Sequence, residues 1–176
     1  MRLGNTDISY QNSSFLSLEK DMGLIVRKLL EDEQLKKMLF YKTKDCLEQP
    51  ELTQQQTYSL IGNQIKIVPK TEIHKEGKPV ILISFDNFIP NSTNPEFRDN
   101  YIIFDIFCPF DIWEMGDFRL RPYKIAGRLD ARLNNKKLTG IGTLHFISGN
   151  NLVVNNELAG ISLTYAAIHG KDDEIE

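Results

Sequence analysis

One segment constrains the fold of this chain more than any other, the run Tyr-Ile-Ile-Phe-Asp-Ile-Phe-Cys at residues 101–108. Successive side chains of a strand point to opposite faces, and both faces of this segment are apolar except at Asp105. A strand that is apolar on both faces lies inside a sheet and is covered on both sides. The sequence therefore predicts a central strand from Asn100 to Cys108.

Helical spacing dominates the chain before this strand. Apolar residues three and four positions apart share one stripe from Phe15 to Leu30, which predicts a helix, and a second helix is predicted to end near Met38. Thr53 is predicted to cap a short helical turn that runs towards Leu60.

A further helix is predicted after the central strand. It opens at Pro122, which fits the first turn of a helix because its missing N–H has no helical partner there. Its buried stripe consists of Ile125, Ala126, Leu129 and Leu133. Its predicted outer face is basic and contains Arg119, Arg121, Lys124, Arg128 and Arg132.

Shorter apolar runs predict the remaining strands. Residues 65–68 and 79–85 are expected to pair as a hairpin with a projecting polar tip at 71–78, followed by a loop at 86–99. Residues 141–147 and 160–168 are expected to form two more strands, with a turn in Ser-Gly-Asn-Asn at 148–151.

The predicted class is α+β. We expect a mostly antiparallel sheet of four to five strands, with an N-terminal helix and a second helix packed on it. Residues 15–170 form the predicted single domain, preceded by a flexible arm at 1–14 and followed by an acidic disordered tail at 171–176.

Composition narrows the possible functions. The 176 residues carry 21 Lys and Arg against 24 Asp and Glu, a net charge of −3, which argues against a strongly basic nucleic-acid clamp. No signal peptide or membrane segment is expected, because the longest aliphatic or aromatic runs have four residues. Cys46 and Cys108 are far apart and are expected to be reduced thiols, with Cys108 buried in a strand.

Catalytic motifs are not recognisable, so no enzyme activity, metal or cofactor is expected. The histidines at 74, 145 and 169 fall on separate predicted elements, and His145 is expected to be a satisfied or exposed strand residue. One alternative stays open. Asp86 and Asp105 could converge on a divalent ion, with Asp111 and Asp117 nearby in the chain, as in a metal-dependent nuclease.

Apolar side chains crowd the region around the central strand and its exit loop. They can staple the loop to the core or form an anchor for a partner protein, and the sequence does not separate these interpretations. The residues concerned are Phe97, Tyr101, Phe110, Ile112, Trp113, Met115, Phe118 and Tyr123.

Residues 65–169 resemble the tail terminator and tail-completion proteins that join head and tail in tailed phages. The resemblance rests on the strand at 101–108 with Trp113 soon after it, and on Arg-Pro-Tyr-Lys-Ile at 121–125. It also rests on Thr-Gly-Ile-Gly-Thr-Leu at 139–144 and on the stretch from Leu158 to Tyr165.

This resemblance implies a structural virion protein without an active site, located in the tail or neck and assembled in the host cytoplasm. Its subunits would form a homo-oligomeric ring, expected to be hexameric, that ends the tail tube and meets the head connector. Double-stranded DNA would pass through the lumen without sequence-specific binding. A different assembly component, such as a connector or baseplate adaptor, remains an alternative.

A closed ring needs two different patches that meet on neighbouring subunits. The candidate ring contact is the predicted hairpin tip at 71–78 against the sheet or the basic helix face of a neighbouring subunit. The loop at 91–100 and the N-terminal arm are candidates for contacts with the tail tube or the connector. The residues chosen are Glu72, His74, Lys75, Glu76, Phe97, Arg98, Trp113, Arg128 and Arg132.

Overall fold

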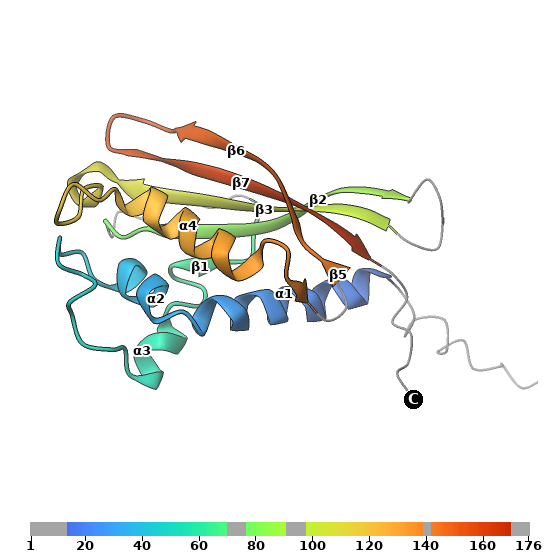
Figure 1. Cartoon of the computed structure of the whole chain (residues 1–176), viewed down its shortest axis with the longest axis horizontal. Helices are drawn as coiled ribbons and strands as arrows, with labels where there is room; N and C mark the ends of the chain where they lie inside the picture. Colours follow the sequence, from blue (N-terminus) through green and yellow to red (C-terminus); the bar gives the residue numbers. More distant parts are fainter. Residues whose placement is uncertain (1–13, 70–76, 91–97, 139–141, 170–176) are drawn as a thin grey trace, which may run out of the picture.

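The computed structural model describes residues 14–69, 77–90, 98–138 and 142–169. Four α-helices and a five-stranded sheet of order β1-β2-β3-β7-β6 make up this part of the chain (Figure 1). The helices are α1 (Ser14–Leu30), α2 (Glu33–Phe40), α3 (Gln54–Ser59) and α4 (Arg121–Leu133). The sheet strands are β1 (Ile65–Lys66), β2 (Val80–Pro90), β3 (Arg98–Pro109), β6 (His145–Val153) and β7 (Leu158–His169). The pair β4 (Lys137–Leu138) and β5 (Gly142–Thr143) forms a separate two-stranded sheet, and a 3₁₀ turn, η1 (Phe110–Ile112), follows β3.

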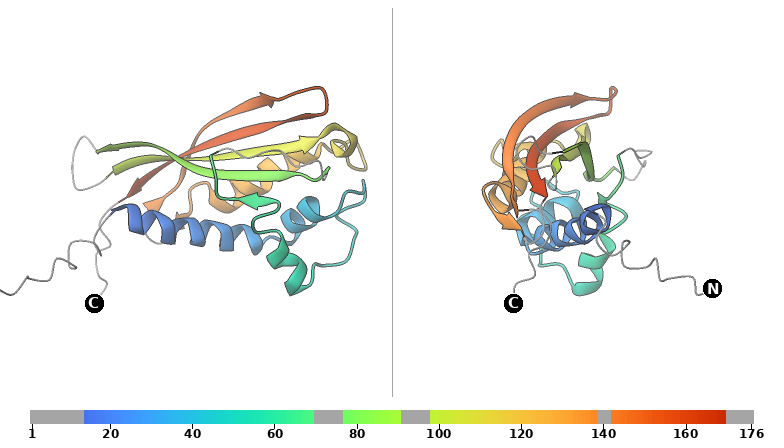
Figure 2. Two further views of the ribbon diagram at one scale, coloured as in Figure 1. Left: turned by 180° about the vertical axis from the view of Figure 1, so that it is seen from behind. Right: turned by 90° about the vertical axis from the view of Figure 1, so that its right-hand side faces the viewer.

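The α+β prediction is confirmed, and the helices form one layer against one face of the sheet. Helices α1, α2 and α4 lie on the same side of the twisted sheet (Figure 2). The core between the layers joins the apolar stripes of these helices to alternate residues of β2, β3 and β7. Tyr165 of β7 is fully buried there, and its hydroxyl donates a 3.0 Å hydrogen bond to Asp130 of α4.

Capping side chains begin two of the helices, and the predicted cap at Thr53 is confirmed. Asp32 precedes α2 and its side chain accepts a hydrogen bond from Leu35 N at 3.0 Å. Thr53 and Gln56 form a reciprocal capping box at the start of α3. These caps satisfy N–H groups that have no partner within the first helical turn.

Strand β3 is central, as predicted. It pairs along its length with β7 and, apart from a register shift, with β2, and Ile102, Phe104 and Ile106 are fully buried on its helix-facing side. The expected cover on the opposite face is wrong for the described residues, because no described helix lies there and Ile103 is only half-buried (Figure 2). The apolar pattern identified the strand's place in the sheet but not the number of layers.

Gly160 allows β7 to approach β3 closely. A Cβ added at Gly160 would lie 1.8 Å from the carbonyl oxygen of Ile106 and 2.8 Å from its carbonyl carbon. Real Cβ atoms do not approach backbone this closely, so this position requires glycine.

The predicted hairpin at residues 65–85 is wrong. Strand β1 runs parallel to β2, with Ile65 beside Ile81 and Lys66 beside Leu82, so the sheet is mixed. Alternation predicts a strand but carries no information about its direction, which the path of the connecting chain decides. Strand β1 lies at the edge of the sheet.

The predicted loop at 86–99 is shorter than expected, and the predicted turn at 148–151 is wrong. Strand β2 continues to Pro90 and β3 starts at Arg98, within the predicted loop at 86–99. The predicted turn at 148–151 lies inside β6, and the chain turns instead around Asn155, whose side chain accepts from Glu157 N at 2.9 Å. Strand β6 is at the edge of the sheet, where solvent can satisfy polar residues that would disfavour a central strand.

Several predictions fall outside the described residues. These are the arm up to residue 13, most of the hairpin tip at 71–78, and the acidic tail. Helix α1 begins at Ser14, one residue before its predicted start. Within the described residues, no helix is both long and apolar enough to cross a membrane.

Candidate functional site

Arg121 anchors the loop that leaves the central strand. Its side chain is completely buried at the start of α4. The guanidinium donates five hydrogen bonds to backbone carbonyls, at distances from 2.7 to 3.3 Å. The accepting carbonyls belong to Ile112, Met38, Tyr41, Lys42 and Thr43. Most of these carbonyls lie at or after the C-terminal end of α2, where a helix leaves acceptors unsatisfied and carries partial negative charge.

The prediction that Arg121 belongs to a basic outer face is therefore wrong. Arg121, Ile125, Leu129 and Leu133 are four residues apart and are all buried. The four-residue spacing from Ile125 was a signal that could have placed Arg121 on the buried stripe. Charge alone misled the prediction.

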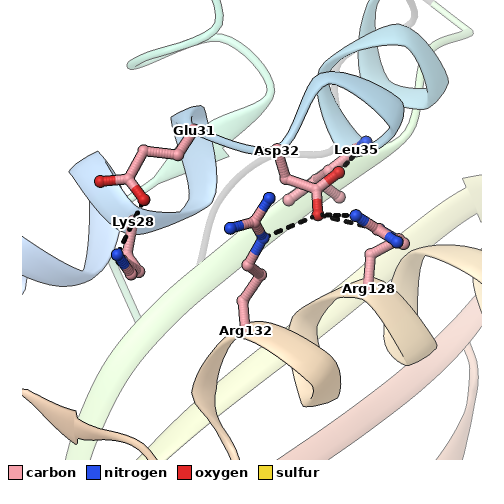
Figure 3. A network of polar contacts seen from close by, with 6 residues as sticks. All are labelled: Lys28, Glu31, Asp32, Leu35, Arg128 and Arg132. Carbon is pink, nitrogen blue, oxygen red and sulfur yellow. Dashed lines mark hydrogen bonds and ion pairs between the residues drawn. The ribbon is translucent and has the colours of Figure 1, made fainter.

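Asp32 joins α2 to α4 through two arginines (Figure 3). One oxygen of its buried carboxylate accepts hydrogen bonds from Arg128 Nε at 2.8 Å and from Arg132 Nε at 3.0 Å. Burial by itself raises the pKa of Asp32, but the hydrogen bonds from Arg128, Leu35 N and Arg132 outweigh it and lower the pKa. Asp32 is therefore a carboxylate at neutral pH.

Arg128 and Arg132 therefore have a structural partner within the same chain. Their side chains are 32% and 33% exposed, so contact with a neighbouring subunit stays a prediction. Replacing both with glutamate would place negative charge beside Asp32, so this substitution cannot separate subunit stability from assembly.

A tight hairpin lies between β3 and α4. Glu114 and Leu120 bridge its ends, and Met115 N donates to Arg119 O at 2.7 Å. The two central residues, Asp117 and Phe118, have φ values of 59° and 57°. Two positive φ angles define the type I′ class of turn, which favours Asn-Gly or Asp-Gly. Phenylalanine in the second position is strained by about 1 kcal/mol or more.

The side chain of Phe118 is 91% exposed, so packing does not offset this strain. Other large apolar side chains are exposed at the same end of the molecule, where the β6–β7 turn meets η1 through a 3.0 Å hydrogen bond from Phe110 N to Glu157 O (Figures 1 and 2). We call this surface the apolar end, and it comprises Phe110, Phe118, Leu120, Tyr123, Val153 and Val154.

The stapling interpretation of the aromatic cluster is confirmed for some of its residues, and the role as a partner anchor stays a prediction for the exposed ones. Ile112 and Met115 are buried and staple the loop to the core. Trp113 is half-buried with its ring 5.6 Å from that of Phe110, whereas Phe118 projects into solvent. Nothing in the residue types distinguished the two groups.

Both edges of the main sheet are open over part of their length. Strand β1 covers only Ile81 and Leu82 of β2, so among the described strands none lies beside β2 from Ile83 to Pro90. Asn134 covers the start of β6 by accepting from Phe146 N at 3.1 Å. From Ser148 to Val153, no described strand lies on the free side of β6.

Asp86 and Asp105 do not meet. Both lie on the sheet face away from the helices, but Asp105 is in register with Leu82, four residues before Asp86. This offset separates them by about 13 Å along the strands, too far to share one ion. In the described part of the chain, no group of three or more His, Cys, Asp or Glu residues is placed to hold a metal ion.

The thiols are buried, as expected for Cys108. Burial raises the pKa of Cys108 to about 12 and also raises the pKa of Cys46. His145 is exposed, as expected, with its Nδ1 3.1 Å from Asn135 Oδ1. Cys46 Sγ lies 3.9 Å from Met115 Sδ, in the region that Arg121 anchors.

Most of the other predicted contact residues cannot be placed. Glu72, His74, Lys75, Glu76 and Phe97 lie outside the described residues, and so does the side chain of Arg98, whose backbone begins β3.

Fold and surfaces together define a two-layer α+β domain with open sheet edges and an apolar end. A family model named YomW matches residues 32–167, and the chain belongs to this family. The family name is of the kind given to phage-derived proteins, so the match is consistent with a phage origin. The match does not specify a tail terminator. A search of curated proteins found no match.

Proposed function

We propose that the chain is a structural virion protein, the subunit of a ring that ends the tail tube and joins it to the head connector. The ring is expected to contain six subunits, with DNA passing through its lumen. The observation that carries this proposal is the pair of open sheet edges, one on β6 and one on β2.

Two different open edges on one sheet suit a heterologous interface. The free edge of β6 on one subunit can pair with the free edge of β2 on the next, and repetition closes a ring when the rotation between subunits divides a full turn. Backbone pairing would satisfy exposed N–H and C=O groups along both edges.

The sequence of β6 does not block such pairing. Natural edge strands are commonly protected by lysine, proline or inward-pointing charge. The segment from Ser148 to Val153 has none of these residues, and Val153 is 86% exposed. An unprotected edge of this length supports a role in assembly rather than in a free monomer.

The sheet face away from the helices suits DNA passage without binding. Strand alternation and register place three carboxylates on this face, those of Asp86, Asp99 and Asp105. If the ring turns this face to the lumen, carboxylates repel phosphate, whereas cationic contacts would retain DNA.

Light scattering coupled to size-exclusion chromatography tests the proposal on untagged full-length protein. The expected result is one discrete ring species, and Asn151→Lys with Val153→Lys, at two exposed positions of the open β6 segment, should convert it to monomers. A matched control, Tyr58→Lys, replaces another exposed apolar residue, on α3 away from both edges, and should leave the ring intact.

A protein that stays monomeric at every concentration, and also when mixed with its tail tube, would contradict the ring. Rings that persist in the β6 double variant would exclude edge pairing as their interface.

A further inference from the structure

We propose that the hairpin at residues 114–120 is a docking knob for a second virion protein, with Phe118 inserted into an apolar pocket bordered by Lys or Arg. This inference depends on the proposed function in one respect, namely that the partner is a protein of the same virion. It concerns the hairpin at residues 114–120, which belongs to neither of the open edges on β2 and β6.

Backbone strain and exposure coincide at Phe118. Its φ of 57° suits glycine or asparagine, and its ring, 91% exposed, gains no packing within the subunit in return. Strain that the fold does not offset is typical of functional positions. An aromatic side chain offers about 150–250 Å² of surface, so Phe118 alone presents a large contact.

The knob is held rigidly before any partner binds. Arg121 N donates to Trp113 O at 2.8 Å, and Gly116 N donates to Lys44 O at 3.1 Å. Arg119 Nε donates to Gly116 O at 2.8 Å, within the turn itself. A rigid loop loses little conformational freedom on binding, so more of the contact energy appears as affinity.

The neighbouring surface area is adequate for a specific contact. Phe110 and Tyr123, at 46% and 52% exposure, are further exposed aromatic residues, one in η1 before the hairpin and one in α4 after it. With about 150–250 Å² per aromatic side chain, the three rings expose on the order of 300–450 Å². That area is as large as the biggest apolar patch on a typical monomer.

Charge around the knob decides the kind of partner. Asp117 is 89% exposed directly beside Phe118 and forms a 3.1 Å ion pair with Arg119, while Glu114 forms a 3.7 Å ion pair with Lys44. Asp111 adds a third, exposed carboxylate, so the loop and its two cationic partners carry a net charge of −1. Two copies meeting through this same surface would bring like charges together, and an anionic membrane would repel it. A protein pocket with a cationic rim fits both features.

The variant Phe118→Gly isolates the contact from the fold. It creates Asp-Gly, the sequence that this turn favours, so the melting temperature should stay the same or rise by a few degrees. A matched control, Tyr58→Ala, removes another exposed aromatic ring, 60% exposed on α3.

The probes are heads and tails purified separately from a phage whose gene for this chain is deleted. Wild-type protein and Tyr58→Ala should bind one of the two particles. Phe118→Gly should bind it at least about 30-fold more weakly, the loss expected for a central aromatic anchor. Asp117→Lys should also weaken binding.

Equal binding of Phe118→Gly and wild type, or no binding of the wild type to either particle, overturns the proposal. Loss of the ring in Phe118→Gly also overturns it, because the knob would then belong to the contact between copies. A wild type that forms no ring yet binds a particle through Phe118 contradicts the proposed ring but supports the knob.

Discussion

The Nε atom of Arg128 donates a 2.8 Å hydrogen bond to the buried carboxylate of Asp32, which lies 96 positions earlier in the chain. The same carboxylate caps α2 and also accepts from Arg132 (Figure 3). One side chain thus begins a helix and fastens it to another, and its removal should be costly.

Replacing Asp32 with alanine should lower the free energy of unfolding by about 2–4 kcal/mol, because both the cap and the partner of two arginines are lost. Asp32→Asn keeps a capping oxygen and should cost less. Urea denaturation measures the free energy of unfolding of both Asp32 variants. Lys28→Ala breaks the exposed pair with Glu31 and should cost less than about 1 kcal/mol. Equal losses for Asp32→Ala and Lys28→Ala would contradict the structural role of the cluster.

The same carboxylate predicts a pH dependence with a definite sign. The pKa of Asp32 is lowered in the folded state, so its contribution is fully present above the unfolded pKa, about 3.9, and is lost as pH falls through the lower folded pKa. The stability difference between wild type and Asp32→Asn should be largest near neutral pH and shrink on acidification to about pH 2–3. Urea titrations across this pH range test the prediction, and a stability difference that grew on acidification would contradict it.

Gly160 and Gly127 form a contrasting pair. Gly160→Ala should destabilise the domain by at least about 3 kcal/mol or disrupt β7, because the new Cβ meets the backbone of Ile106. Gly127 lies inside α4 with nothing within 4 Å of its added Cβ. Gly127→Ala should therefore stabilise by about 0.5–1 kcal/mol. Thermal melts of the two variants would move in opposite directions.

Arg121→Leu should cost at least about 3 kcal/mol, because it leaves buried carbonyls without donors. Limited proteolysis should then cut the loop between β3 and α4. Lys124→Leu is the control, an exposed residue one turn further along α4, and should change stability by less than about 0.5 kcal/mol. If Arg121→Leu left both stability and cleavage unchanged, the anchoring role would be wrong.

Thiol reactivity tests the burial of the two cysteines. Cys46 and Cys108 are buried with raised pKa values, about 12 for Cys108, so few thiolates form at neutral pH. A disulfide reagent should label them slowly in the native protein and rapidly in denaturant. Rapid labelling of the native protein would indicate frequent opening of the core.

Local signals predicted much of the secondary structure. The capping residue before α3 and the apolar stripe of α4 act within one or two helical turns, so short stretches of sequence contain them in full. Turn chemistry was less informative. Asp-Phe at 117–118 is no turn signal, yet it forms the tight turn, while Ser-Gly-Asn-Asn at 148–151 lies inside a strand.

The α+β class, the main helices and the central position of β3 could be predicted from the sequence alone, because hydrophobic periodicity depends on near neighbours along the chain. Local patterns did not settle the direction of β1, the burial of Arg121 or the pairing of Arg128 with Asp32, which the folded structure shows. Each of these depends on groups brought together from distant parts of the chain. A guanidinium is equally compatible with solvent or with buried oxygen acceptors, and the fold determines which of them surrounds it.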